Sequence, residues 1–568
     1  MNDVSTAAPG DAPVGMVSGA ALMAHCASFA ERMKLSGTPD ELASIRTIQA
    51  KLDGFGYRTA LLSHDAYISL PGPARVEVDG QAVQAITHSF SVPSPGLTAP
   101  VAYVGDGGAA EFAGQDLRGC IVLAEGIASP AVAARAAQAG AAGQLHISPH
   151  EHLHEMCISP VWGNPGLSTL ADLPVTVACT ISNADGSALR ERVLRDEAPL
   201  VTLHAQVDTG WRPTPLLVAD LDGPEPGAPK PGAPKPGGPF ILFSGHHDTW
   251  YFGVMDNGSA NATMIECARV LAGQSAAWRR GLRLCFWSGH SHGRYSGSAW
   301  YVDNHWDELE RRCAVHVNVD STGGVGATVL TEAAAASELT ALAAGAIRQE
   351  TNAGHEGKRN ARNSDMSFWG VGIPSMFGSL SHQPPAPVAM RNALGWWWHT
   401  PHDLLDKIDE ANLVRDTRVF VRTLWRLLTE PVLPLDYAAH ASALLEELAG
   451  IEASLDGALS LEPLVTAAAA LRDGAVALME PGRDPARVNR ALMQLSRALV
   501  PADCTAGDRF SHDPALPQPP WPVLDPIRAL AGAGPNQAGF AAVDATRARN
   551  RMLHALRQAG RALDAALA

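Results

Sequence analysis

Residues 240–258 constrain the fold of this chain more than any other stretch. The apolar run at 240–243 is bounded by Pro and Gly, which is typical of a buried strand in a parallel sheet. His246, Asp248 and Asp256 follow the run, and the chain beyond them has the apolar spacing of a helix. Because ligands of open α/β sheets bind beyond the carboxyl ends of the strands, these three side chains are expected in a site.

The three side chains suit a divalent metal. Imidazole nitrogen and carboxylate oxygen are both good zinc ligands, so His246 is expected to bind an ion, and Asp256 could bridge two ions with its two oxygens. Asp248 could lie beneath the ring of His246 and fix its tautomer. The alternative for this stretch alone is a polar loop with an Asn-Gly turn at residues 257–258.

Beyond this stretch, short apolar runs alternate with segments of helical spacing as far as about residue 430. That alternation predicts a doubly wound α/β domain with a mostly parallel sheet. Near the N-terminus, Thr38 and Pro39 suit the N-cap and the first position of a helix. With these helical segments, a metallohydrolase catalytic domain is expected to comprise residues 17–64 and 206–430.

The remaining segments predict three further parts. Residues 65–205 show a strand, strand, helix and strand pattern of their own. Residues 222–239 repeat the sequence GAPKP, which cannot bury a core, so they are expected to form an exposed Pro/Gly-rich loop. Residues 431–568 carry Ala and Leu at helical spacing and predict a helical C-terminal domain that packs on the core or mediates dimerisation.

A histidine-rich run lies within residues 65–205. It could bind a metal, but we favour an irregular loop near a cleft, with its imidazoles in solvent. The histidines of the run are His146, His150, His152 and His154.

The composition excludes several classes of partner. The net charge of −15, from 43 Lys and Arg against 58 Asp and Glu, argues against nucleic acid or an anionic membrane. The 8 cysteines are scattered and form no close pair typical of a zinc knuckle or a disulfide scaffold. The sequence shows neither a signal peptide nor a run of roughly 20 apolar residues, so a cytoplasmic protein with reduced thiols is expected.

Four further segments supply candidate ligands beyond predicted strands. A lone Asp or His at a strand end is more often a cap or a satisfied polar group, but convergence on one sheet edge favours a site. These candidates are His290, His292, Asp320, Asp365 and His399.

The order of these motifs resembles the co-catalytic zinc peptidases, which include bacterial aminopeptidases, glutamate carboxypeptidase II and the transferrin receptor. The segments VAYVGDG and RGCIVL, with the Ala-rich helix after them, resemble the protease-associated domain that is inserted in several peptidases. The resemblance implies the zinc aminopeptidase fold with that α/β insertion, and a homodimer. The matching motifs are His246-x-Asp248, Asp256-Asn257, Asn318-Val-Asp320-Ser, Ser364-Asp365 and His399-Thr-x-x-Asp403.

Carried over residue by residue, the resemblance implies two neighbouring ions. His246 and Asp320 would hold one ion, His399 would hold the second, and Asp256 would bridge them. Asp248 would support His246 from behind.

The chain departs from the family at its Glu-Glu motif, in which the first Glu is the general base and the second is a metal ligand. Counting back from Gly297-Ser298 places Ser291 and His292 at these positions. His292 can still bind a metal, and the loss of a charge favours zinc, iron or nickel at this second site. Ser291 cannot act as a base near neutral pH. The base is then either His290, since histidine titrates near pH ~6.5, or metal-activated water alone.

Two further points concern side-chain direction and aromatic residues. Neighbouring side chains on an extended segment point oppositely, so His290 is expected to face away if Ser291 faces the ions.

Trp398 replaces a family Tyr whose hydroxyl polarises the scissile carbonyl, and Trp donates only an indole N–H. Trp398, Trp250 and Trp287 could line a pocket or could pack in the core.

We therefore expect a metal-dependent hydrolase of an amide-type C–N bond in a small or peptide-like substrate, using metal-activated water and an atypical second metal site. One or two divalent ions per chain are expected, with zinc preferred and iron or nickel as alternatives. Two other functions stay open. One is a conventional amino- or carboxypeptidase with His290 as base, and the other is a non-catalytic binding protein like the transferrin receptor.

Overall fold

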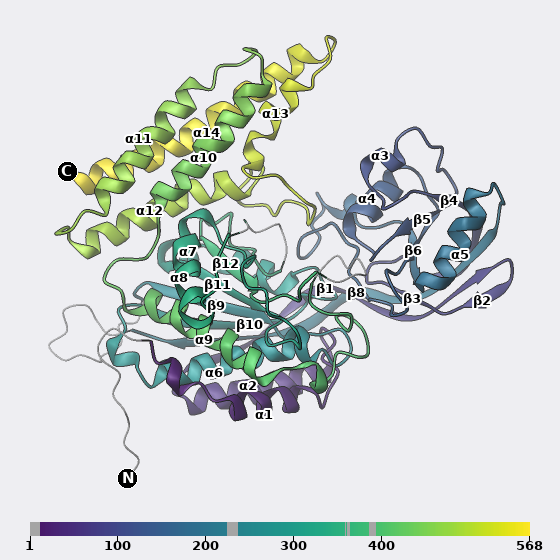
Figure 1. Ribbon diagram of the computed structural model, residues 1–568, viewed down its shortest axis with the longest axis horizontal. Coiled ribbons are helices and arrows are strands. Elements are labelled where there is room, and N and C mark those ends of the chain that lie inside the picture. Colours follow the sequence, from purple (N-terminus) through teal and green to yellow (C-terminus); the bar gives the residue numbers. More distant parts are fainter. Residues whose placement is uncertain (1–11, 224–236, 358, 360–363, 386–392) are drawn as a thin grey trace.

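The computed structural model describes residues 12–223, 237–357, 359, 364–385 and 393–568. Most of the predicted loop at 222–239 lies outside these residues. Within them, twelve strands form one mixed sheet that is flanked by helices (Figure 1). The predicted α/β fold class, with a large central sheet, is confirmed.

The strand order within the sheet is β12-β11-β9-β10-β8-β4-β5-β6-β7-β3, with β1 paired to β8 and β2 to β1. The group β9–β12 is parallel, whereas β8 pairs antiparallel with β10, β4 and β1. The strands are β1 (Arg58–Val78), β2 (Gln81–Val83), β3 (Ala85–Thr87), β4 (Ser94–Tyr103), β5 (Ile121–Glu125), β6 (Gly143–Ile147), β7 (Val177–Ile181), β8 (Leu200–Leu221), β9 (Phe240–His246), β10 (Gly281–Trp287), β11 (Cys313–Asp320) and β12 (Ser375–Ser379).

A long antiparallel ribbon of β1 and β8 connects two parts of the molecule. At one end β8 pairs with β10, and at the other end it pairs with β4 (Figure 1). The predicted boundaries at residues 65 and 205 fall inside these paired strands. We call the part beyond the ribbon, formed by β2–β7 with α3 (Ala109–Phe112), α4 (Pro130–Gln138) and α5 (Asn183–Leu194), the distal unit.

The strand β9 is covered by helices on both faces. Ile241 and Phe243 pack in the core that includes α1, α2, α6 and α9, whereas Phe240 and Leu242 pack on the opposite face with α7. Every residue of β9 is buried, which explains its unbroken apolar run. The helices of this part are α1 (Gly19–Phe29), α2 (Pro39–Gly54), α6 (Ala260–Ala272), α7 (Ser296–Arg312), α8 (Thr340–Thr351) and α9 (Glu410–Thr429).

Helix α2 begins as its sequence predicts. The Thr38 side chain accepts a hydrogen bond from the main-chain N–H of Glu41, and Pro39 is the first helical residue. The Thr38 side chain pairs one of the free N–H groups at the helix N-terminus, and Pro39 has no N–H to leave unpaired.

The C-terminal helices pack beside the α7 and α8 side of the sheet (Figure 1). A buried ion pair joins the two parts, since His440 Nδ1 lies 3.0 Å from Glu338 Oε2. Among the helices of the described ranges, none has both the length and the apolar character needed to cross a bilayer. The C-terminal helices are α10 (Tyr437–Ser454), α11 (Glu462–Leu478), α12 (Pro485–Cys504), α13 (Asp525–Ala531) and α14 (Ala538–Leu567).

The Glu338–His440 pair predicts a pH-dependent stability. Burial opposes the imidazolium, but the hydrogen bond and charge of Glu338 outweigh burial and raise the pKa of His440. A raised folded-state pKa stabilises the protein below the unfolded value of about 6.5, and this contribution is lost as pH rises through the folded value. We expect His440→Asn to lower the free energy of unfolding by roughly 3 kcal/mol at about pH 6 and by less in alkali, as measured by chemical denaturation.

The matched control is His554→Asn, because His554 lies exposed on α14 in the same group of helices. It should leave the unfolding free energy within about 0.5 kcal/mol at either pH. An equal loss at both pH values for His440→Asn would show that the imidazole packs there without titrating.

Candidate metal centre

The structure brings four predicted ligands together at the carboxyl ends of β9 and β11. His246 ends β9, Asp320 ends β11, Asp256 lies in the turn between β9 and α6, and His399 precedes α9. His246 Nε2 lies 3.2 Å from Asp256 Oδ1 and 3.5 Å from Asp320 Oδ1. On the other side, His399 Nε2 lies 3.0 Å from Asp256 Oδ2. Asp256 therefore presents one oxygen to each imidazole.

Main-chain carbonyls fix the tautomers of both imidazoles. His246 Nδ1 donates to the carbonyl of Asp248 at 2.8 Å, and His399 Nδ1 donates to the carbonyl of Glu155 at 2.7 Å. Because a carbonyl can only accept, each Nδ1 carries a proton, so the neutral form of each ring has its lone pair on Nε2, which faces Asp256. This is the tautomer in which an imidazole can bind a metal through Nε2.

The residues present fit a divalent ion. His246 Nε2 and Asp256 Oδ1 are buried, yet within the described part of the chain neither atom has a hydrogen bond of acceptable geometry. Buried polar atoms without partners are rare, and two acceptors that face the same space suit a cation. A donor set of imidazole nitrogen and carboxylate oxygen is typical of zinc.

The electrostatics keep the bridging carboxylate ionised. Burial opposes ionisation, but the imidazoles of His246 and His399 beside the carboxylate hold the pKa of Asp256 well below its usual range. Burial likewise opposes protonation of His246, but Asp320 and Asp256 raise the pKa of His246. Burial lowers the pKa of His399 despite Asp256. Asp256 is thus a carboxylate at neutral pH, as a shared metal ligand must be.

A residue that sequence reasoning left without a role, Asp403, holds Asp256 in place. Asp403 Oδ1 accepts from the main-chain N–H of Met255 at 2.8 Å, and Oδ2 accepts from that of Asp256 at 3.0 Å. Burial raises the pKa of Asp403 to about 7. In the sequence, Asp403 is marked only by its place in the motif His399-Thr-x-x-Asp403, which does not indicate that it holds Asp256.

Asp248 lies behind the site, and its carboxylate contacts groups other than the ring of His246 that the resemblance implied. Its Oδ2 accepts from Ser36 Oγ at 2.6 Å and from the main-chain N–H of Ser291 at 2.8 Å, and its Oδ1 accepts from the N–H of His290 at 3.2 Å. The carboxylate is 3.9 Å from His246 Nδ1. It is therefore the carbonyl of Asp248 that orients His246, while the carboxylate anchors the turn at 290–291.

His290 faces the site, contrary to the expectation that it points away. Residues 288–295 form bends and turns, so the alternation of an extended strand does not apply. The ring of His290 stacks on that of His246 with centroids 3.6 Å apart and planes inclined by 12°. His290 Nδ1 lies 2.8 Å from Asp365 Oδ2, and Asp365 Oδ1 accepts from Ser298 Oγ at 2.8 Å. Asp365, which the sequence analysis gives as a candidate ligand, thus orients His290.

The stacking argues that His290 is not a second ligand of the ion at His246. Ligand atoms of His246, His290 and Asp320 lie within 4.8 Å of one another, which by proximity alone would allow a shared ion. A metal, however, binds a ring nitrogen in the plane of the ring at about 2 Å. Two nearly parallel, stacked rings share no such point. His290 Nε2 therefore stays available for a proton or for substrate.

Ser291 lines the cavity, whereas His292 lies behind it. The Ser291 hydroxyl is buried and has no hydrogen-bond partner among the described residues. His292 Nδ1 lies 2.9 Å from Ser36 Oγ, and its ring centroid lies 4.3 Å from that of Trp250. His292 is absent from the cavity lining of the described residues. His292 Nε2 is nevertheless buried without a hydrogen-bond partner among the described residues, so His292 stays a candidate ligand beside His399 and Asp256.

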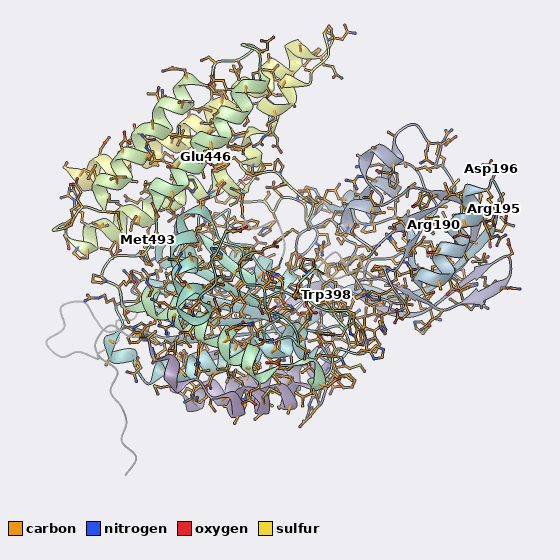
Figure 2. The ribbon with its side chains drawn as sticks, viewed as in Figure 1. Arg190, Arg195, Asp196, Trp398, Glu446 and Met493 are labelled. Carbon is orange, nitrogen blue, oxygen red and sulfur yellow. The ribbon has the colours of Figure 1, made fainter. Side chains whose placement is uncertain are left out.

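The distal unit holds the loop that carries His399. His154 Nδ1 donates to the carbonyl of Trp398 at 2.5 Å, and the N–H of Glu155 donates to the carbonyl of His399 at 3.1 Å. Trp398, which stacks on His399 with centroids 3.4 Å apart, lies between the distal unit and the main sheet (Figure 2). Burial raises the pKa of the Glu155 carboxyl to about 7. Sequence reasoning missed Glu155 because its carbonyl, not its side chain, contacts His399.

The histidine-rich run differs from the solvated loop that its sequence predicted. His146 belongs to β6 and is buried, and His154 is buried against Trp398. His150 Nδ1 accepts from the N–H of His152 at 3.1 Å, so His150 Nε2 carries the proton and donates to His154 Nε2 at 3.1 Å. The His150 and His154 rings satisfy one another and His146 bonds to Gln144 at 3.0 Å, which disfavours a metal among these rings.

A cavity of about 660 Å³ opens at the candidate ligands. That volume suits a small molecule or a short peptide. Trp250 and Trp398 line it, as expected for an aromatic pocket, while Trp287 packs in the core beneath α7. The residues that line the cavity include Asp256, His290, Ser291, Arg294, Tyr295, Asp320, Glu332 and His399.

Comparison with known proteins identifies relatives of the α/β part. Residues 230–424 match the model of peptidase family M28. A probable glutamate carboxypeptidase, VP8, from Zea mays is 26% identical over 240 residues, which are 38% of this chain and 32% of that protein. Aminopeptidase NAALADL1 from Rattus norvegicus is 24% identical over 323 residues, 48% of this chain and 43% of that protein. The matched regions thus span less than half of these relatives.

Solved structures share the fold. The aminopeptidase from Aneurinibacillus sp. strain AM-1 superposes with a TM-score of 0.56 at 22% identity, covering 73% of this chain and 95% of that one. A peptidase M28 precursor from Shewanella amazonensis gives a TM-score of 0.57 at 18% identity, covering 73% and 94%. The resemblance to the co-catalytic zinc peptidases is confirmed.

The ligand geometry predicts two metal affinities of different strength. The set of His246, Asp256 and Asp320 should bind zinc more tightly than the set at His399, which lacks a third charged ligand. We expect about one tightly held ion per chain by elemental analysis after dialysis. His246→Ala should lose this ion, and His399→Ala should keep it.

Ser291→Glu should restore a carboxylate beside His399. The affinity for the second ion, measured by zinc titration, should rise at least about tenfold, because even outer contacts of a ligand change metal affinity by about 10–100-fold. Ser454→Glu, at an exposed position at the end of α10, serves as the control and should leave both affinities unchanged. If a change at His292 alters the zinc affinity and a change at Ser291 does not, then His292 and not Ser291 faces the ions.

Proposed function

We propose that this chain, whose residues 230–424 match peptidase family M28, is a metal-dependent hydrolase of amide-type C–N bonds in small or peptide-like molecules. The observation that carries the proposal is the pair of imidazoles that present Nε2 to the two oxygens of Asp256 at the wall of a cavity of about 660 Å³. The names of the relatives, aminopeptidase and glutamate carboxypeptidase, support hydrolysis of an amide.

The residues that would hold the metal are His246, Asp256 and Asp320, with His399 at the weaker set. Zinc is the proposed ion, because nitrogen and oxygen donors without thiolate suit it. When bound, such an ion polarises a carbonyl group and lowers the pKa of water to about 7. It supplies the electrophilic part of the reaction, and the protein must supply orientation and proton transfer.

His290 is the proposed proton carrier. Asp365 holds its Nδ1–H, so His290 Nε2 faces the cavity with a lone pair. His290 can take a proton from the attacking water and give it to the nitrogen of the departing amine. The buried carboxylate of Asp365 stabilises the imidazolium that forms between these two transfers. This arrangement replaces the carboxylate base of the related peptidases with a carboxylate-oriented imidazole.

Trp398 has a positioning role in this proposal. Its ring stacks on His399 and lines the cavity, so it limits rotation of that imidazole and excludes water from one side. The indole offers a single N–H and no acidic hydroxyl. Polarisation of the carbonyl is therefore assigned to the metal and not to residue 398.

His290→Gln tests the assignment directly. We expect kcat for amide hydrolysis to fall by about 10²–10⁴-fold, the usual contribution of a general acid–base, with KM and zinc content unchanged. The measurements are steady-state kinetics with a panel of acyl 4-nitroanilides and elemental analysis of the same samples.

The matched control is His512→Gln. His512 forms a comparable pair with Asp303, at 3.2 Å on the exposed surface of α7, and should leave kcat unchanged. Loss of zinc from His290→Gln would instead identify His290 as a ligand. An unchanged rate would place the base elsewhere and remove His290 from the mechanism.

A further inference from the structure

A row of buried hydrogen bonds extends from Asp365 away from the cavity. Asp365 Oδ1 accepts from Ser298 Oγ at 2.8 Å, and Ser298 Oγ lies 2.9 Å from Ser367 Oγ. Ser367 Oγ in turn accepts from Trp162 Nε1 at 2.9 Å. All four side chains are buried. We call the two hydroxyls between Trp162 and Asp365, those of Ser298 and Ser367, the serine bridge.

The chemistry of the groups fixes the direction of each bond in this row. An indole nitrogen only donates, so Trp162 donates to Ser367. A carboxylate only accepts, so Ser298 donates its single proton to Asp365 and must accept from Ser367. The carbonyl of Tyr295 competes for the Ser298 proton, but at 3.2 Å it is a more distant and uncharged acceptor. All three protons therefore point toward Asp365.

The serine bridge gives the carboxylate of Asp365 one fixed orientation. Ser298 holds Oδ1, so Oδ2 is the oxygen that meets His290 Nδ1 at 2.8 Å. Hydrogen bonds that point the same way polarise one another and strengthen the last bond of the row. A buried carboxylate also needs such donors, because an ionised group without partners in the interior is costly. The direction in which His290 Nε2 faces thus depends on this row.

Trp162 connects the serine bridge to two other parts of the molecule. It lies between β6 and β7 of the distal unit. Its ring packs on that of Tyr295, which precedes α7, with centroids 4.4 Å apart, and it belongs to one apolar cluster with Ala515, which follows α12. The N–H of Ala515 donates to the carbonyl of Pro160 at 2.7 Å. The far end of the row therefore depends on the docking of the distal unit and of the C-terminal part.

We infer that Ser298, Ser367 and Trp162 are positioning residues for the proton carrier His290. They act through Asp365, and none of the three is among the described residues that line the cavity. Correct docking of the distal unit places the Trp162 N–H, which then orders the serine bridge and Asp365. The inference rests on the proposed function, because it concerns the imidazole to which proton transfer is assigned there.

Two variants of the full-length, zinc-loaded protein test the inference by kinetics with acyl 4-nitroanilides. Ser298→Ala removes the bond to Asp365 and should lower kcat by about 10–100-fold, as the loss of a hydrogen bond to a charged group does. Trp162→Phe keeps an aromatic ring at the junction but removes the N–H, and it should lower kcat by about 3–10-fold. KM and zinc content should stay within about twofold in both variants.

A double-mutant cycle separates positioning from a general loss of structure. In a His290→Gln background, Ser298→Ala should change kcat by less than about twofold, because the group that it positions is absent. An equal loss of kcat in both backgrounds would overturn the inference and make Ser298 a structural residue. An unchanged kcat for Ser298→Ala in the wild-type background would overturn it as well.

The matched control is Ser496→Ala. Ser496 has an equally buried hydroxyl, on α12 among the C-terminal helices, and it accepts from the hydroxyl of Tyr437 (Figure 1). Its loss removes a buried hydroxyl that is not part of the serine bridge. We expect kcat to stay unchanged.

Proton magnetic resonance gives a readout that needs no turnover. The Nδ1–H of His290 beside a buried carboxylate should give a signal downfield of the amide protons, which His290→Gln identifies by removing it. Ser298→Ala and Trp162→Phe should shift this signal and speed its exchange with solvent, whereas Ser496→Ala should do neither. If the wild type cleaves no amide, a shifted signal still supports the positioning role without the proposed hydrolysis. A signal that is the same in wild type and both variants would overturn the inference at any rate of hydrolysis.

Discussion

The shared position of Asp256 between two imidazoles is the constraint on which the rest of the site depends. One carboxylate must face His246 and His399 at once, so the main chain at residue 256 can have only one position. Asp403 fixes that position by accepting the N–H groups of residues 255 and 256. Strand β9, the turn after it and the loop before α9 must therefore meet within a few ångströms, and the doubly covered sheet provides the rigid frame for this meeting.

The turn between β10 and α7 shows how the proposed chemistry can change while the ligands stay. The anchor of this turn is the buried carboxylate of Asp248, which holds the N–H groups of His290 and Ser291. Asp365 then directs His290 into the cavity, and the stacked ring of His246 limits its rotation. A neutral imidazole and a hydroxyl in this turn make the cavity less negative than two carboxylates would. That difference lowers the negative charge available to a metal ion at His399.

The distal unit contributes to the centre through its main chain. Glu155 and His399 exchange two hydrogen bonds although 244 residues separate them, and His154 holds the neighbouring carbonyl of Trp398. The paired ribbon of β1 and β8 restricts how far the unit can move from the main sheet, because a continuous ladder resists bending more than a flexible linker does. The tautomer of one ligand thus depends on the docking of an entire neighbouring unit.

The sequence by itself determined the parts of this protein that depend on local pattern. Unbroken apolar runs predicted the buried strands, Thr38 and Pro39 predicted the start of α2, and the spacing of His246, Asp256, Asp320 and His399 placed candidate ligands beyond strands that share one edge. These inferences succeed because hydrophobic periodicity and strand direction repeat along the chain.

Only the tertiary structure decided which side of each turn faces the cavity. Counting residues predicted that His290 would face away from the ions, but bends at residues 288–295 remove the alternation on which that prediction relied. The partners Asp365 and Glu155 come from segments that are distant in the sequence from the residues they contact. Side-chain direction in an irregular turn is set by packing and by long-range hydrogen bonds, and no local pattern in the sequence encodes either of them.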